Sequence, residues 1–179
     1  MTADPTPPLT FRAATDDDVA AVVALVESAY RGDASRAGWT TEADFLDGRR
    51  TGPDDVRAQL ARPDSRILLG FRGDALVACA HVAVEDGAGY FGMFSVVPGL
   101  QGGGLGKRVL AEAERIARDE FGQRTMAMTV IDLRDELIAF YERRGYRRTG
   151  VHRPFPYGDA RFGLPRRDDL RFEVLEKSL

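Results

Sequence analysis

Residues 91–107 place a β-type run, a proline and a glycine-rich turn directly before a long amphipathic helix. The segment reads FGMFSVVPGLQGGGLGK. The apolar residues of the following helix recur at spacings of three and four, at Leu105, Val109, Ala113, Ile116 and Ala117. The first backbone N–H groups of such a helix lack intrahelical partners, and the peptide dipoles leave about half a positive charge there. The order of elements therefore predicts a phosphate-binding helix terminus.

The turn itself is suited to an anion. Gly102, Gly103, Gly104 and Gly106 lack the Cβ atoms that would keep a phosphate oxygen away from the backbone amides. Lys107 and its neighbour Arg108 add positive charge at the rim. A flexible, glycine-rich loop is the alternative interpretation, because a glycine cluster alone is a weak signal.

Two common phosphate motifs are excluded by spacing. A P-loop needs a glycine five residues before Gly106 and a hydroxyl residue after Lys107, but the chain has Gln101 and Arg108 there. A dinucleotide fingerprint, GxGxxG, fails in both possible registers of the turn.

The segment resembles the signature of the GNAT superfamily of acyl-CoA-dependent N-acetyltransferases. That signature is a strand, a Val-x-Pro step and (Gln or Arg)-x-x-Gly-x-(Gly or Ala) opening a helix, which corresponds here to Val96, Pro98, Gln101, Gly104 and Gly106. A second block, LIAFYERRGYRRTG at residues 137–150, looks like the C-terminal helix and strand of the family, with Tyr141 at the position of its usual tyrosine. The two motifs lie about 30 residues apart, and the resemblance covers residues 9–179.

Periodicity and turn signals predict a single domain that mixes helices and strands. We expect a disordered tail at residues 1–8 and one domain at residues 9–179. The expected strands are 9–13, 66–71, 76–84, 90–97, 125–131, 146–149 and 170–175, and the expected helices are 19–30, 41–49, 54–61, 105–121 and 134–144. These elements predict an α/β or α+β fold with a βαβ unit at its centre. The resemblance further implies a mostly antiparallel sheet of about six or seven strands, splayed between the fourth and fifth and flanked by helices.

The resemblance also implies how acetyl-CoA would lie. The pantetheine arm would run between the splayed strands along Phe94, Ser95 and Val96, whose backbone rather than side chains would be used. A main-chain N–H near these residues would polarise the acyl carbonyl. The diphosphate would lie on the segment of Gln101, Gly102, Gly103, Gly104, Leu105, Gly106 and Lys107.

Tyr141 is the candidate general acid, because a phenol with a pKa of about 10 holds its proton until the leaving sulfur needs it. Considered alone, an aromatic residue on this helix face is more often part of the core. An alkylamine with a pKa of about 10.4 must lose a proton before it attacks. His81 is the candidate base, although a histidine on a strand is more often simply packed; a base acting through water, or no base, remains open.

The chain departs from better-understood relatives at two positions. Arg134 stands where many carry an asparagine, seven residues before the tyrosine, and Thr129 stands where some carry a glutamate base. Arg134 lies on the face of Tyr141 and is a candidate for cofactor binding, with a solvated surface arginine as the alternative. For Glu42 and Asp44 we expect a role in capping and solvating a short helix, rather than contact with an amine substrate.

Composition limits the partners. The chain has 179 residues, 44% of them hydrophobic, and a formal charge of −3 with both signs mixed, which disfavours nucleic acid. The single cysteine, Cys79, is expected in the core, and His81 and His152 stand too far apart to suggest a metal site. With no apolar signal segment or membrane-length run in this sequence, we expect a cytoplasmic protein without a membrane partner.

The sequence thus predicts an enzyme that moves an acetyl group from acetyl-CoA to a primary amine of a small molecule or a peptide. A longer acyl group, or a CoA-binding module without turnover, are the alternatives. The acceptor is hidden because the irregular segments 31–52 and 152–169 would build its pocket. Their aromatic residues hint at an apolar wall: Trp39, Phe45, Phe155, Tyr157 and Phe162. A homodimer is left open.

Overall fold

The computed structural model describes residues 5–38 and 40–179 of the chain. Residues 1–4 of the predicted tail and Trp39 of the predicted aromatic wall lie outside the described residues. Within the described part, seven strands form one sheet in the order β1-β3-β4-β5-β6-β9-β7, and two short strands form a second sheet. The bounds of the large sheet are β1 Leu9–Ala13, β3 Ser65–Arg72, β4 Ala75–Glu85, β5 Ala88–Val96, β6 Thr125–Ile131, β7 Arg147–Pro154 and β9 Arg171–Ser178.

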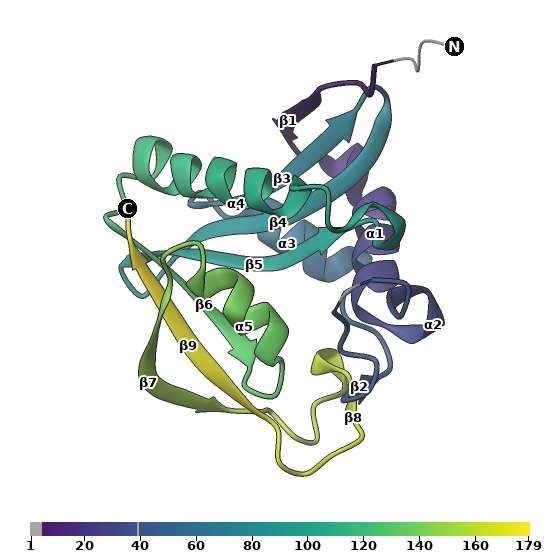
Figure 1. Cartoon of the computed structure of the whole chain (residues 1–179), viewed down its shortest axis with the longest axis vertical. Coiled ribbons are helices and arrows are strands. Elements are labelled where there is room, and N and C mark those ends of the chain that lie inside the picture. Colours follow the sequence, from purple (N-terminus) through teal and green to yellow (C-terminus); the bar gives the residue numbers. More distant parts are fainter. Residues whose placement is uncertain (1–4, 39) are drawn as a thin grey trace.

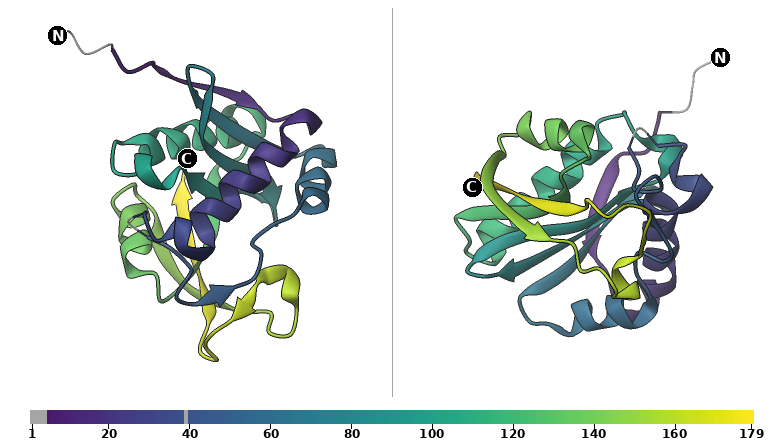
Figure 2. Two further views of the ribbon diagram at one scale, coloured as in Figure 1. Left: turned by 90° about the vertical axis from the view of Figure 1, so that its right-hand side faces the viewer. Right: turned by 90° about the horizontal axis from the view of Figure 1, so that it is seen from below.

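Helices cover both faces of this sheet (Figures 1 and 2). Their bounds are α1 Val19–Tyr30, α2 Gly32–Ser35, α3 Pro53–Ala61, α4 Leu105–Arg115 and α5 Asp135–Glu142. Along β3, Ile67 and Leu69 pack in the cluster that contains residues of α1 and α3, whereas Leu68 packs in the cluster that contains residues of α4 and α5. This alternation is the period-two pattern of a strand buried on both faces.

The sheet is antiparallel except at one place. β5 pairs with β6 in parallel, and only through Gly89 with Met126 and Tyr90 with Ala127. Beyond these pairs the two strands diverge, as Figure 1 shows. The mixed fold and the splay between the fourth and fifth strands of the sheet are therefore confirmed.

α4 begins at the glycine-rich turn and continues into a π-helical turn at Ile116–Glu120, before Gly122 ends it with a φ of +66°. α5 begins after Arg134 and is followed by Gly145, whose φ is +96°. Both glycines occupy the left-handed conformation that commonly ends a helix.

Two irregular segments depart from the prediction. No helix forms at 41–49; a turn there leads into β2, Leu46–Asp47, which pairs with β8, Leu164–Pro165. β7 also extends to Pro154, so the long predicted loop begins later than expected. Paired backbone between the two segments satisfies the polar groups that the helix would have used.

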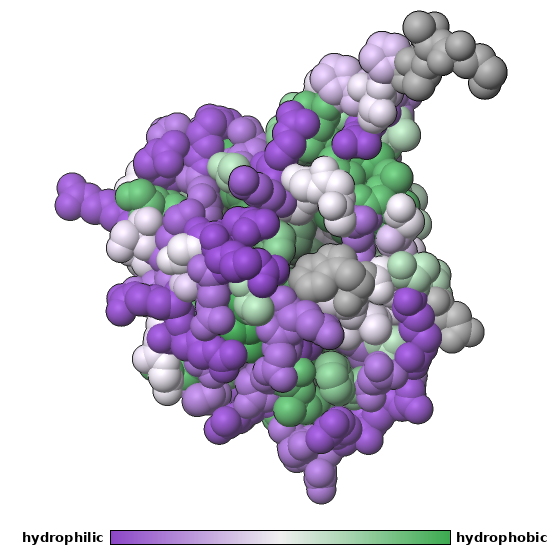
Figure 3. Space-filling model, in the orientation of Figure 1, coloured by the Kyte–Doolittle hydropathy of each residue, from purple (hydrophilic) through white to green (hydrophobic). Residues whose placement is uncertain are grey.

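The surface in the orientation of Figure 1 is mainly hydrophilic, with apolar residues in small separate groups (Figure 3). None of the helices in the described part of the chain is long and apolar enough to cross a membrane.

Candidate active site

The glycine-rich turn lies at the end of β5 and opens α4. Gly104 is the residue before the first turn of α4, and its φ of +77° favours glycine. The Arg108 N–H donates to the Gly104 carbonyl at 3.2 Å, so the amides of residues 105–107 precede the first intrahelical bond. A Cβ added to Gly102 or Gly104 would meet no atom within 4 Å, so open space lies beside both residues. The geometry is that of an anion-binding helix terminus.

Gly106 has a packing role in addition to the one expected from the sequence. A Cβ on this residue would lie 2.9 Å from Cζ of Phe94. Its missing side chain lets α4 approach the Phe94 ring, which stacks on Phe140 of α5 at 6.4 Å between ring centroids. Gly106 therefore positions the helix against the splayed strand.

A first cavity of about 330 Å³ opens beside this turn. It is bounded by the end of β5, the turn and α5. Its wall includes these predicted cofactor residues: Phe94, Val96, Gln101, Gly102, Gly104, Gly106, Lys107 and Arg134. The charged residues described in the wall are all cationic, namely Lys107, Arg134, Arg143 and Arg144. Such a wall favours an anionic ligand.

Three of the predicted cofactor residues are not among those lining the cavity: Ser95, Gly103 and Leu105. The Ser95 hydroxyl is buried and donates to the Met93 carbonyl at 3.2 Å, and Leu105 packs in the core. Only the backbone of Ser95 and Leu105 is available for the roles that we expected. The Gln101 amide donates to the Val96 carbonyl at 3.2 Å and so ties the turn to the end of β5.

β5 bulges next to this cavity. His81 pairs with Gly92 and Cys79 with Ser95, so Met93 and Phe94 together face the single residue Ala80. Met93 has a φ of +51°, which is unusual for a residue with a side chain. Such a bulge interrupts the regular ladder of backbone hydrogen bonds exactly where the sequence predicts a main-chain donor for the acyl carbonyl. Bulges and strained residues of this kind concentrate at functional sites.

A second cavity of about 340 Å³ lies on the other side of the splay. It shares Tyr30, Phe94, Arg134 and Leu137 with the first. Its further wall includes β6 residues, His81, Tyr90, Tyr141 and Phe162. The two cavities therefore adjoin each other at these shared residues, Phe94 among them.

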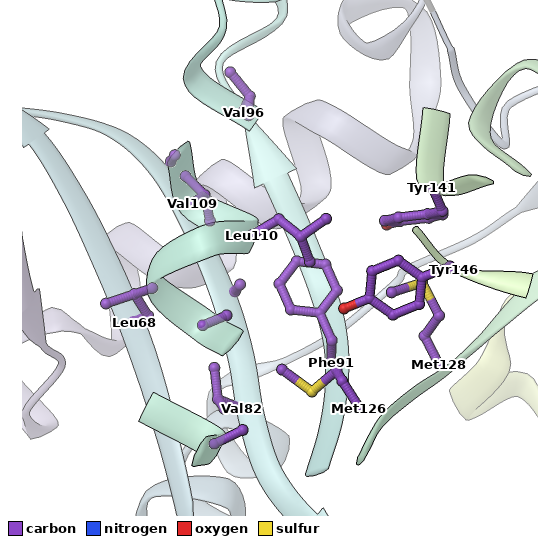
Figure 4. Close-up of a cluster of buried hydrophobic side chains, with 14 of the residues drawn as sticks. Leu68, Val82, Phe91, Val96, Val109, Leu110, Met126, Met128, Tyr141 and Tyr146 are labelled. Atoms are coloured by element: carbon purple, nitrogen blue, oxygen red, sulfur yellow. The ribbon is translucent and has the colours of Figure 1, made fainter. Parts of the chain in front are cut away.

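Tyr141 lies in the second cavity wall and in the aromatic core. Its ring packs against Phe91 and Tyr146 at 6.3 and 5.9 Å between centroids (Figure 4). Burial raises the pKa of Tyr141 well above its usual value. Among the described residues, none forms a hydrogen bond with its hydroxyl, whereas the Tyr146 hydroxyl donates to Glu114 at 3.0 Å. The Tyr141 phenol thus stays protonated, and its O–H donates no hydrogen bond to any described residue.

His81 also lines the second cavity, but its environment disfavours the role of base. Its Nε2 lies 2.7 Å from the Ser65 hydroxyl. Burial, together with the positive charge of Arg62, lowers the pKa of His81 to about 4. The imidazole is therefore neutral at pH 7 and a weak proton acceptor.

Arg134 is not a solvated surface residue. It is 8% exposed, and its Nη1 lies 3.0 Å from Oε1 of Glu42. Arg31 binds the other carboxylate oxygen of Glu42 at 2.6 Å. The expectation that Glu42 solvates a surface helix is thus wrong, because the carboxylate is buried between two arginines. Asp44 is exposed and pairs with Arg36 at 2.7 Å.

The predicted aromatic wall is divided. Phe162 lines the second cavity, whereas Phe45 and Phe155 pack in a separate core cluster with Leu46 and Ile131. The Tyr157 hydroxyl accepts from the Leu170 N–H at 2.9 Å and so anchors the C-terminal loop.

Sequence reasoning missed several cationic residues of the two walls: Arg31, Arg50, Arg143 and Arg144. The paired arginines in ERRGYRR, directly after Tyr141, were the available signal for the last two. Arg31 and Arg50 lie in irregular segments, where no periodicity assigns a side chain to a cavity.

Comparison with known proteins identifies proteins that are similar to this chain in sequence and in fold. The model of the acetyltransferase (GNAT) family matches residues 35–146. An IAA acetyltransferase of Azospirillum brasilense is 32% identical over 102 residues, which cover 55% of this chain and 64% of the relative. A mycothiol acetyltransferase of Kineococcus radiotolerans is 34% identical over 101 residues, covering 55% of this chain and 29% of the relative. The chain therefore matches less than two thirds of the length of each of these relatives.

A solved structure extends the likeness over almost the whole fold. The PaiA N-acetyltransferase of Thermoplasma acidophilum, in complex with coenzyme A, has a TM-score of 0.68. The match covers 96% of this chain and 99% of that chain at 14% identity. At this identity the likeness concerns the fold.

Proposed function

The chain belongs to the acetyltransferase (GNAT) family, and we propose that it moves an acetyl group from acetyl-CoA to a primary amine of a small molecule or a peptide. The observation that carries this proposal is the meeting of the two cavities beside Phe94, one with an anion-binding turn and the other with Tyr141 in its wall. Acetyl-CoA supplies an activated thioester, whose acyl carbon the amine attacks.

The first cavity is the proposed site for acetyl-CoA. The amides at residues 102–107, together with Lys107, suit the diphosphate, and Arg143 and Arg144 add charge on the facing side. The pantetheine arm would follow the backbone of residues 94–96 into the splay, and the bulge at Met93 would present a main-chain N–H to the acyl oxygen.

Tyr141 is the proposed general acid. As the carbon–sulfur bond breaks, its hydroxyl would give a proton to the departing sulfur. The proton that the attacking nitrogen loses as the amide forms would restore the phenol, and the proton that the ammonium group loses before attack would go to solvent water. Burial raises the pKa of Tyr141. Burial of the departing sulfur in the same cavity would raise the pKa of its thiol as well, which favours transfer of the phenolic proton.

Loss of the amine proton needs no strong base on this proposal. Arg31, Arg50 and Arg134 line the second cavity, and like charges lower the pKa of an ammonium group placed among them. His81, with its pKa lowered to about 4, would contribute little. The rate should therefore follow deprotonation of the amine and rise with pH up to the pKa of the bound amine. A pH profile controlled instead by a group with a pKa near 4 would restore His81 as the base.

The direct test is release of free CoA thiol from acetyl-CoA in the presence of a panel of amines. We expect amine-dependent release by the wild type and a large loss with Tyr141→Phe. Binding of acetyl-CoA in calorimetry without amine-dependent release would instead favour a binding module. Release only from longer acyl-CoA thioesters would favour a different acyl group.

A further inference from the structure

The charges in the wall of the second cavity are unbalanced. Among the described residues that line it, Arg31, Arg50 and Arg134 are cationic and Glu42 alone is anionic. The remaining polar residues in the wall, His81 included, carry no charge at pH 7. Positive charge that faces a cavity costs free energy unless carboxylates offset it; those that interact with Arg50 are Glu42 and Glu27, and Glu27 does not line the cavity.

Each carboxylate oxygen of Glu42 already accepts a hydrogen bond from one of the arginines. Its Oε2 accepts from Arg31 at 2.6 Å and its Oε1 from Arg134 at 3.0 Å. Both arginines are more than nine-tenths buried, and the Nε–H of each has no partner among the described residues. Glu42 thus satisfies the buried arginine donors of the cavity wall only in part, and the buried Oε1 of Gln59 in the same wall also has no hydrogen-bond partner among the described residues.

Backbone hydrogen bonds hold Arg50 in place, whereas its guanidinium has no hydrogen-bond or ion-pair partner among the described residues. The N–H groups of Arg50 and Thr51 both donate to Oε1 of Glu27, at 2.5 and 2.8 Å. The Arg50 guanidinium lies 5.0 Å from the centre of the Tyr30 ring, which Arg134 also approaches, at 5.8 Å. Within the described part of the chain, this guanidinium forms neither an ion pair nor a hydrogen bond. Its planar set of N–H donors is therefore positioned and available.

We propose that the second cavity binds an acceptor carrying a carboxylate as well as the amine, and that Arg50 receives this carboxylate. The inference rests on the acetyl transfer proposed above and names its class of acceptor. A carboxylate matches the guanidinium fork with two parallel hydrogen bonds and compensates the excess positive charge of the wall. The amine of the same molecule would then face the opening beside Phe94.

The same wall disfavours a polyamine. A second ammonium group would need a carboxylate of its own, and the carboxylate of the described wall, Glu42, already pairs with Arg31 and Arg134. The cavity, at about 340 Å³, is also at the small end of ligand sites, which suits an amino acid or a peptide terminus with an acidic side chain.

The test compares acceptors that differ only in charge. The panel contains L-amino acids, their carboxamides, short peptides with and without an acidic residue next to the terminus, and the diamine putrescine. Affinity is measured by calorimetry with CoA present, and kcat/KM by thiol release. We expect at least one amino acid or acidic peptide to exceed its uncharged counterpart about tenfold or more, with putrescine weakest. Whichever carboxylate source gives the higher kcat/KM, the free amino acid or the acidic peptide, identifies the class of acceptor.

Arg50→Gln should remove this preference by weakening carboxylate acceptors about tenfold or more relative to their carboxamides. Arg49→Gln is the matched control, because Arg49 is exposed and is not among the lining residues of either cavity. Unchanged CoA affinity in both variants shows that they fold. Equal affinity for carboxylate and carboxamide, failure of the whole panel to bind, or an Arg50→Gln variant that keeps the preference would overturn the inference. A carboxylate preference in binding without any thiol release would overturn the proposed function and leave the carboxylate site standing.

Discussion

Gly104 and Gly106 lie in the same turn but are needed for different physical reasons. Gly104 has a positive φ and faces open space, whereas Gly106 has a neighbour, Phe94, where a Cβ would lie. The first requirement concerns the backbone and the ligand, and the second concerns the packing of α4 on the splayed strand.

We therefore expect Gly104→Glu to abolish CoA binding, because the substitution puts bulk and negative charge where the diphosphate would lie. The left-handed backbone adds about 1–2 kcal/mol of strain, which the fold should survive. Gly99→Ala is the control: Gly99 has no positive φ, a Cβ there would meet no atom within 4 Å, and the residue is not among those lining the first cavity. Calorimetric titration showing unchanged CoA affinity in Gly104→Glu would contradict the assignment of this turn.

Tyr141→Phe should separate catalysis from stability. The ring contacts with Phe91 and Tyr146 remain, and none of the described residues loses a hydrogen bond. We expect kcat to fall by about 10²–10⁴, the usual contribution of a general acid, with stability changed by less than about 1 kcal/mol. Full activity in this variant would remove Tyr141 from the mechanism.

At this scale the sequence indicated the glycines and Tyr141, because a local motif carries them. It did not indicate the buried ion pairs of Glu42 or the position of Arg50 in a cavity wall. Glu42 and Arg134 are 92 positions apart in the chain, and only the fold brings them to 3.0 Å. A carboxylate in a polar, irregular segment looks solvated until its distant partner is known.

Among the elements, regular strands and helices were predictable and the irregular segments were not. The strand from Leu76 onward and the helix after Gly104 have clear periodicity, and both form. The segment 41–49 was wrongly predicted as a helix. Tertiary contacts outweigh local preference there: Leu46 and Asp47 pair with β8 while Glu42 is bound by arginines.

Glu42→Gln should destabilise the protein by about 3–5 kcal/mol, because it leaves two buried arginines without their counter-charge. Asp44→Asn in the same segment breaks only an exposed pair with Arg36 and should cost less than about 1 kcal/mol. Denaturant unfolding of both variants measures the difference. Equal effects would show that the Glu42 cluster contributes no more than a surface pair.

The Glu42 cluster also predicts a pH dependence. Burial alone would raise the pKa of Glu42, but Arg134 and Arg31 outweigh it and lower that pKa. A carboxylate with a lowered pKa in the folded state stabilises fully above its unfolded pKa of about 4.3, and this stabilisation is lost as the pH falls through the folded value. The stability gap between the wild type and Glu42→Gln should therefore be constant near neutral pH and close below about pH 4. A gap that is unchanged in acid would contradict the ion-paired state.

For the molecule as a whole, two adjoining cavities accompany the splay of one sheet. β5 and β6 share only two residue pairs, and Phe94 in the diverging part of β5 lines both cavities. The sequence could indicate the order of the elements, and the family resemblance indicated the splay. Neither could indicate which side chains of the irregular segments close the acceptor cavity.

Binding of CoA to the folded state alone should stabilise the whole molecule. At a CoA concentration about 100 times its Kd the gain is about 2.7 kcal/mol, or a rise in Tm of about 5–10 °C for a chain of this size. Thermal unfolding with and without CoA measures the shift, and Gly104→Glu should show none. An equal shift in this variant would mean that CoA binds elsewhere.

The most direct test of the account is a crystal structure of the protein with acetyl-CoA. The account predicts the diphosphate within hydrogen-bonding distance of the backbone amides at residues 102–107, and the thioester in the splay between Phe94 and Tyr141. Density for the diphosphate away from the start of α4, or a thioester remote from the junction of the two cavities, would contradict it.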